Sequence, residues 1–200
     1  PEGCLITDGG GNLYGTAQCG GLCASGTVFR LAKGSDTITT LASFNGRNGA
    51  YPVAGLIADA SGNLYGTTGY GGAGNAGTAF KLMKDSGAIT TLANFNGRKG
   101  AYPYGRLIVD ASGNLYGTTR GGGARDCGTV FKLAKDSGKV TTLTSFNGIN
   151  GAYPYGGLIA DASGILYGIT VNGGVGGYGT IFKITGTPRG DGIPGAAFDV

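Results

Sequence analysis

The chain has 200 residues, of which 45 are glycine and 13% are charged, and its formal net charge is +4. This composition excludes a helical bundle and a highly charged disordered chain, and it favours strands and turns. Because the lysines and arginines recur along the chain instead of clustering, the charge also argues against a nucleic-acid-binding surface.

One unit of sequence occurs four times, with a constant step of 51 residues. Its Leu-Tyr-Gly core begins at Leu13, Leu64, Leu115 and Leu166. A Gly-Thr-x-Phe motif in every copy and a Phe-Asn-Gly motif in the first three keep the same step. A unit of this kind cannot bury its apolar face alone and has to pack on the next copy. The spacing therefore predicts a repeat protein built from one supersecondary unit.

Residues 52–102 illustrate the strands expected in each unit. Residues 55–59 are almost wholly apolar, which predicts a strand buried on both faces. Asp59 then opens a tight turn that leads to a hairpin partner at 63–68. After a Gly-rich connection, residues 77–82 alternate apolar and polar, and the β-branched run 89–95 forms a fourth strand.

Four antiparallel strands joined by three short connections and one long return are typical of a β-propeller blade, which usually has about 40–50 residues. The competing fold is a parallel β-helix, but its rungs are shorter and leave no place for tight hairpin turns. We therefore expect an all-β, β-propeller-like array of four four-stranded blades. The predicted domain spans 1–185, and its blades cover about 1–51, 52–102, 103–153 and 154–185.

The fourth copy departs from the others after its third strand. The Thr-Thr-Leu-x-x-Phe segment of the other copies is missing, and a Gly/Pro-rich tail, 186–200, stands in its place. The fourth blade is thus predicted to lack a regular outer strand, which would leave an open sheet edge. We expect Ile193 and Phe198 to be buried, either on the fourth blade or against a neighbouring molecule.

The repeated pattern GLIADASGNLYGTT, followed by GTVFKL and TTLxSFNG, resembles the GloVer tandem repeat and covers residues 1–184. The layout is also similar to the two-component-regulator and NHL propellers. Membership of the GloVer family would imply an exported, propeller-like array of the kind found in bacterial surface and secreted proteins. The resemblance thus implies an extracellular or cell-surface location and no particular biochemical activity.

The chain contains no histidine, which excludes Ser-His-Asp and Cys-His relays and most zinc sites. The recurring aspartates each open the same turn, so we expect them to close that turn; a calcium ligand or an acid is the alternative. They are Asp8, Asp59, Asp110 and Asp161. We predict no catalytic residue, metal site or cofactor. Cys19 and Cys23 are predicted to form a local disulfide, with free thiols as the alternative, and the pairing of Cys4 and Cys127 stays open.

The tyrosine of each Leu-Tyr-Gly core is expected to pack between blades. The return loops 45–52, 96–103 and 147–154 carry other tyrosines, with arginines and asparagines, at one end of the sheets. Amide, guanidinium and aromatic groups on a stiff scaffold suit a neutral, hydroxyl-rich ligand such as a glycan. Loop packing is the alternative role. The candidate ligand-binding residues are Arg47, Asn48, Tyr51, Arg98, Tyr102, Tyr104, Asn150, Tyr153 and Tyr155, with Tyr70 and Asn172 nearby.

These patterns predict a non-enzymatic exported module whose loops bind carbohydrate. A self-assembling or filament-type cell-surface subunit, with itself as the partner, is the alternative, and a glycan-active enzyme is the third. No stretch approaches the ~20 apolar residues of a membrane-spanning helix, so no membrane span is expected.

Overall fold

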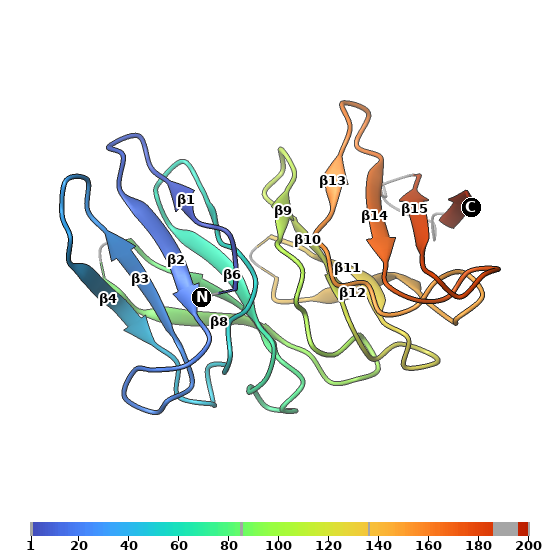
Figure 1. The fold of residues 1–200 in the computed structure, drawn as a ribbon, viewed down its shortest axis with the longest axis horizontal. Coiled ribbons are helices and arrows are strands. Elements are labelled where there is room, and N and C mark those ends of the chain that lie inside the picture. The colour runs from blue at the N-terminus through green and yellow to red at the C-terminus, as the bar shows by residue number, and fades with distance from the viewer. Residues whose placement is uncertain (1, 85, 136, 186–195, 200) are drawn as a thin grey trace. The chain divides into compact units, whose positions relative to one another are not determined.

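The computed structural model describes residues 2–84, 86–135 and 137–185, and the backbone of residues 196–199. These residues form β-strands joined by turns and loops (Figure 1). No helix that could cross a membrane occurs in this described part of the chain.

Each repeat forms one four-stranded antiparallel sheet in which consecutive strands are neighbours. The first strands are β1 (Ile6–Thr7), β5 (Ile57–Ala58), β9 (Ile108–Val109) and β13 (Ile159–Ala160). The second strands are β2 (Leu13–Ala17), β6 (Leu64–Thr68), β10 (Leu115–Thr119) and β14 (Leu166–Thr170). The third strands are β3 (Thr27–Leu31), β7 (Thr78–Leu82), β11 (Thr129–Leu133) and β15 (Thr180–Ile184). The fourth strands are β4 (Ile38–Ser43), β8 (Ile89–Asn94), β12 (Val140–Ser145) and β16 (Ala196–Asp199). The predicted array of propeller-like blades is confirmed.

The first strand of each sheet differs from the expected one. The sequence predicts a strand over 55–59 that is buried on both faces, but only two residues pair in β5, and Ala58 is exposed. The buried side chain is that of Leu56, which precedes the strand. Residues 56 and 58 lie on the same face of an extended chain, so burial on this face decreases along the strand toward the turn at Asp59.

The fourth sheet has a short outer strand drawn from the tail. The four residues of β16 pair antiparallel with β15, and Phe198 lies opposite Phe182 in the register. The outer-strand sequence of the other repeats is absent, as predicted, but the edge of β15 is paired and not open. The burial of Ile193 and Phe198 stays a prediction, because Ile193 lies outside the described residues and only the backbone of Phe198 is described.

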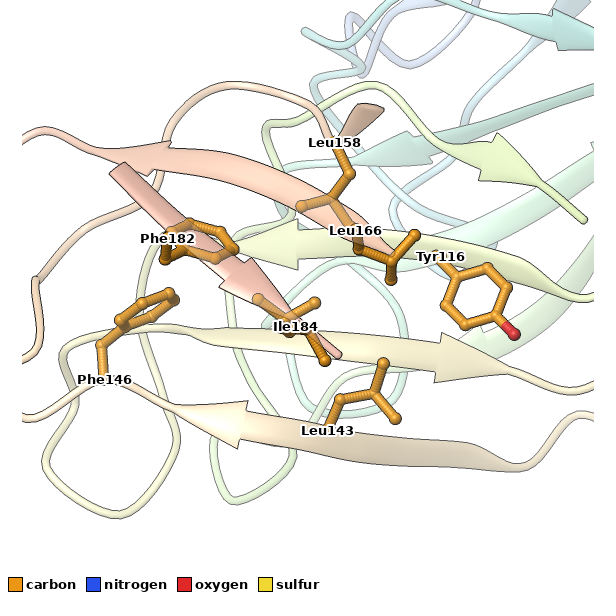
Figure 2. Close-up of a cluster of buried hydrophobic side chains, with 8 residues drawn as sticks. Tyr116, Leu143, Phe146, Leu158, Leu166, Phe182 and Ile184 are labelled. Atoms are coloured by element: carbon orange, nitrogen blue, oxygen red, sulfur yellow. The ribbon is translucent and has the colours of Figure 1, made fainter. Parts of the chain in front are cut away.

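The chain folds into two compact units, residues 1–96 and 97–200, each holding two sheets. The core of the first unit joins Val28 and Phe44 from one sheet to Leu56, Leu64, Phe80 and Leu82 from the next. The core of the second unit is built from the equivalent residues (Figure 2). Its buried members are Tyr116, Val130, Leu143, Phe146, Leu158, Leu166, Phe182 and Ile184.

An aromatic pair marks the same place in both cores. Phe44 packs edge-on against Phe80 with ring centroids 4.9 Å apart, and Phe146 packs in the same way on Phe182 at 5.0 Å. In each pair the first ring follows an outer strand and the second lies on the third strand of the next sheet. Phenylalanines therefore pack between neighbouring sheets within each unit.

Candidate functional site

The turn between the first and second strands of each sheet is closed by its aspartate. Oδ1 of Asp110 accepts hydrogen bonds from the amides of Ser112 and Asn114, both at 2.9 Å. Oδ2 accepts from Nδ2 of Asn114 at 2.8 Å and from the hydroxyl of Tyr116 at 3.0 Å. The same pattern occurs at Asp8 and Asp59. The predicted turn-closing role is therefore confirmed, and these carboxylates are already engaged by the chain itself.

The hydrogen bonds shift the pKa of both partners. The bond from the Asn12 side chain is the largest cause that lowers the pKa of Asp8, to about 2. At Asp110, burial raises the pKa, but the bonds from Asn114 and Tyr116 outweigh it and the net pKa is lowered. Burial and the bond to Asp110 raise the pKa of Tyr116 well above its usual value. These carboxylates thus stay ionised, as acceptors need to be.

The return loops lie at the opposite end of the sheets, together with the connections between second and third strands. We call this the loop end of each unit: residues 45–52 and 69–77 in the first unit, and residues 97–104, 120–128, 147–155 and 171–179 in the second. Gly46 and Ala50 of the first return loop bond to Gly72 and Tyr70 of the next sheet's connection, at distances of 2.8 to 3.0 Å. The other two return loops make the equivalent bonds. The loop end is therefore a hydrogen-bonded frame.

Two asparagines hold each of the first and third return loops. The amide of Asn45 donates to Oδ1 of Asn48 at 2.9 Å, and the amide of Asn48 donates to Oδ1 of Asn45 at 3.0 Å. Asn147 and Asn150 make the same reciprocal pair at 2.8 and 3.1 Å. The carbonyl oxygens of Asn48 and Asn150, which the sequence suggested for a ligand, are thus used to shape the loop.

The tyrosines of the Tyr-Pro sequences have a backbone conformation that is rare for large residues. Tyr51, Tyr102 and Tyr153 have φ angles of 55°, 59° and 55°. The amide of Tyr51 donates to the carbonyl of Ser25 at 2.8 Å, and its carbonyl accepts from Gly69 at 2.9 Å. A glycine would adopt this φ at no steric cost, and strained side chains of this kind concentrate at functional sites. The backbone strain therefore marks these three tyrosines as candidates for a functional role.

Aromatic rings are in contact at the loop end of both units. In the first unit, Tyr51 and Tyr70 pack edge-on with centroids 5.8 Å apart. In the second unit, Tyr104 and Tyr155 pack with centroids 5.2 Å apart and an interplanar angle of 60°. Tyr155 is 50% exposed. Tyr104 and Tyr155 occupy equivalent positions in consecutive repeats, whereas Tyr51 lies in a return loop and Tyr70 in the connection that the loop meets. Each pair leaves part of its ring surface exposed to solvent.

Tyr153 is in contact with Arg120, whose guanidinium carbon lies 5.5 Å from the ring centroid. Such a stack adds a cationic donor to an aromatic surface. Arg120 was not among the predicted residues, because the sequence of its own repeat does not show which return-loop side chain it meets. The constant step of 51 residues between Tyr-Pro loops and connections is the signal that could have found it.

The other candidate ligand-binding residues are Arg47, Arg98 and Tyr102. Arg47 and Arg98 are exposed at the tips of their loops. Tyr102 is half-buried, and its carbonyl accepts from the amide of Arg120 at 2.9 Å. The structure thus groups candidate residues within each unit.

All four cysteines are free thiols in the structure, so the predicted bond between Cys19 and Cys23 is not formed there. Both side chains are exposed in the connection between β2 and β3. In the described part of the chain, no three His, Cys, Asp or Glu side chains are grouped as metal ligands would be.

Comparison with known proteins adds a family and a fold. The family model of the Gloeobacter/Verrucomicrobia repeat matches residues 1–191. No curated protein matches the chain.

Several solved structures are similar in fold. A chain of a nidogen/laminin complex has a TM-score of 0.61 and 18% identity, with 90% of this chain and 59% of that chain covered. An extracellular domain assigned to a hybrid two-component system from B. thetaiotaomicron has a TM-score of 0.61 and 12% identity, with 98% and 22% covered. A gluconolactonase from Xanthomonas campestris has a TM-score of 0.59 and 15% identity, with 90% and 57% covered. The chain thus spans less than two thirds of each of these structures, and the similarity shows the fold alone.

Proposed function

Because the chain belongs to the Gloeobacter/Verrucomicrobia repeat family and presents paired tyrosines at the loop end of its sheets, we propose that it is a non-enzymatic, extracellular carbohydrate-binding module. The observation that carries the proposal is the Tyr104–Tyr155 pair of the second unit, with its half-exposed ring. An extracellular domain among the solved structures of the same fold supports the location.

The chemistry of the pair suits a sugar. The apolar C–H face of a pyranose stacks on an open tyrosine ring, while the phenol hydroxyl provides a hydrogen-bond donor and acceptor for sugar hydroxyls. Two rings at an angle of 60° form a corner that a single flat ring does not provide. The Arg120 guanidinium over Tyr153 adds further donors in the same unit.

A scaffold that holds these rings firmly lowers the entropic cost of binding. The return loop of the third sheet is fixed by the Asn147–Asn150 pair and by two-way bonds between Ala152 and Asn172 at 2.7 and 3.1 Å. The binding surface is therefore preorganised before the ligand binds.

A non-enzymatic role is part of the proposal. The recurring aspartates accept hydrogen bonds within their turns, at the end of the sheets opposite the tyrosines. A glycosidase needs two carboxylates in unlike environments about 5–10 Å apart. An assay for reducing-sugar release and one for lactone hydrolysis test the enzyme alternative, and turnover in either that is lost in Asp110→Asn would contradict the proposal.

The proposal is tested with a glycan array, followed by calorimetry on the best glycan. Tyr155→Ala should weaken binding at least tenfold and leave the melting temperature nearly unchanged, because half of the ring is already exposed. Tyr178→Ala is the matched control, since its ring is 94% exposed and lies in the connection between β14 and β15. An equal loss in both variants would mean non-specific adsorption, and a large fall in melting temperature for Tyr155→Ala would identify a packing role.

Tyr153 allows a second test of the ring. Because its φ is 55°, Tyr153→Gly removes the ring and also relieves the backbone, whereas Tyr153→Ala removes the ring and keeps the strain. We expect both variants to lose affinity equally. The alanine variant should be less stable than the glycine variant, because only glycine relieves the backbone strain. Unchanged affinity in both would exclude Tyr153 from the binding surface.

A further inference from the structure

Each sheet has two different faces, and the cores define them. The front face of the first sheet, which includes Val28, packs on the rear face of the second sheet, which includes Leu56. In the second unit, Val130 on the front of the third sheet packs in the same way with Leu158 on the rear of the fourth. All four of these side chains are at most 4% exposed. One kind of interface, front on rear, is thus used in both units.

The front face of the fourth sheet carries three exposed isoleucines beside Tyr167 and Lys183. Ile181 stands where the first and third sheets carry Val28 and Val130, and it is 69% exposed. Ile159 and Ile169 lie on the same face of the neighbouring strands and are 70% and 55% exposed. Three exposed isoleucines on one sheet face form the kind of patch that marks an interaction site.

The residue at position 169 makes this face more apolar than its counterparts. The equivalent threonines, Thr16 and Thr118, donate to the carbonyls of Ala54 and Gly156 on the next sheet, at 3.2 and 2.9 Å. A threonine would also suit a face that meets water. Isoleucine at this position instead favours a face that is covered by apolar groups.

The rear face of the first sheet is the matching half. Leu5 stands where the other sheets carry Leu56, Leu107 and Leu158, and it is 51% exposed while those three are at most 4% exposed. Ile38, at the start of β4, is 61% exposed, whereas its counterpart Val140 is 6% exposed. This face therefore carries apolar side chains at the positions that contact the front of another sheet within each unit.

We propose that the front face of the fourth sheet in one molecule binds the rear face of the first sheet in a second copy of the same chain. The alignment of the two surfaces follows from the repeat. Ile181 and Leu5 occupy the positions that Val28 and Leu56 occupy in the contact between the first and second sheets. The two surfaces are different, so the contact is heterologous and head-to-tail, and it builds rings or filaments. It uses the sheet faces, since the edge of β15 is already paired with β16.

Light scattering across a range of protein concentrations tests the contact. The wild-type mass should rise with concentration above that of one chain. Ile181→Lys and Leu5→Lys should each remain monomeric, because a charge at the centre of an apolar contact opposes desolvation. An equimolar mixture of the two variants should give a one-to-one dimer and nothing larger, because each variant keeps the face that the other has lost.

Matched controls separate this contact from general stickiness. Leu22→Lys and Val175→Lys change side chains that are 96% and 91% exposed and lie off both faces, so assembly should be unchanged. Circular dichroism should show that all variants keep the wild-type fold. A wild type that stays monomeric at every concentration, an assembly that survives Ile181→Lys, or a loss in only one of the two variants would overturn the proposal. Tyr155→Ala should assemble normally, so a failure of glycan binding is distinguishable from a failure of assembly.

Discussion

The hydroxyl of Tyr116 donates a hydrogen bond to Oδ2 of Asp110 over 3.0 Å, while its ring lies in the core of the second unit and is 1% exposed. One side chain thus ties the first turn of the third sheet to the packing between sheets. Removal of the hydroxyl by Tyr116→Phe keeps the ring and deletes the bond. We expect the free energy of unfolding to fall by about 1–2 kcal/mol, which urea denaturation would measure.

The fourth sheet provides the control for this prediction. Tyr167 donates to Asp161 at 3.0 Å in the same geometry, but that bond is exposed to solvent. Water can replace the lost partner there, so Tyr167→Phe should have a smaller effect than Tyr116→Phe. Equal effects would show that burial of the ring does not strengthen the bond.

Acid should destabilise the fold in a defined range of pH. The pKa of Asp8 is lowered to about 2, and those of Asp59, Asp110 and Asp161 are also lowered. A carboxylate whose pKa is lower in the folded state stabilises the fold above the unfolded pKa of about 3.9, and this contribution is lost as the pH falls through the folded value. The melting temperature should therefore be flat above about pH 5 and fall between about pH 4 and 2. Asp8→Asn should have a lower melting temperature at pH 7 and a shallower fall, and an unchanged pH profile in this variant would contradict the assignment.

Two glycines of the second return loop should respond differently to alanine. Gly97 has a φ of 78° and open space around an added Cβ, so Gly97→Ala should cost about 1–2 kcal/mol from the backbone alone. Gly100 has a φ of 114°, and an added Cβ would come within 2.5 Å of Oγ1 of Thr119. That hydroxyl bonds to Thr129 at 2.8 Å in the buried interior, so Gly100→Ala should cost at least about 1 kcal/mol more than Gly97→Ala. Thermal denaturation of the two variants gives the comparison, and equal costs would show that the threonine pair can move aside.

Deletion of the tail tests the role of β16. Without residues 186–200, the backbone groups of β15 that face β16 lose their partners in the register from Ile181 to Ile184. We expect a lower melting temperature and faster hydrogen exchange at the amides of β15, with little change at β11 in the third sheet. Unchanged exchange at β15 would mean that the tail does not contribute to the fourth sheet in solution.

Most of the fold could be predicted from the sequence because the repeat shows the same pattern several times. The expected strand 63–68 is found as β6 (Leu64–Thr68), and 77–82 is found as β7 (Thr78–Leu82). Period-two alternation and Asp-led turns define these elements locally. The resemblance to the family is likewise confirmed, since the family model matches residues 1–191.

Features that depend on contacts between repeats were harder to predict. The residues of β16 have no strong strand pattern, and their pairing follows from the free edge of β15. The stack of Arg120 on Tyr153 depends on which loop meets which connection. The hydrogen bond from Tyr65 to Asp59 was also not predicted, although both residues recur at a constant spacing. The aspartate was assigned to the turn and the tyrosine to packing between blades, and nothing in the sequence linked the two roles.

The three return loops, two of which are closed by an asparagine pair, also bear on how the protein can change over time. Their tips carry Arg47, Arg98 and Ile149, which are exposed side chains of unlike chemistry on backbones of the same shape. Because the frame is built from backbone bonds and flanking asparagines and glycines, a codon change at the tip alters what the surface offers while the fold is left intact. Duplication of one repeat would add another such tip. Variety in surface chemistry can therefore accumulate at these positions independently of stability.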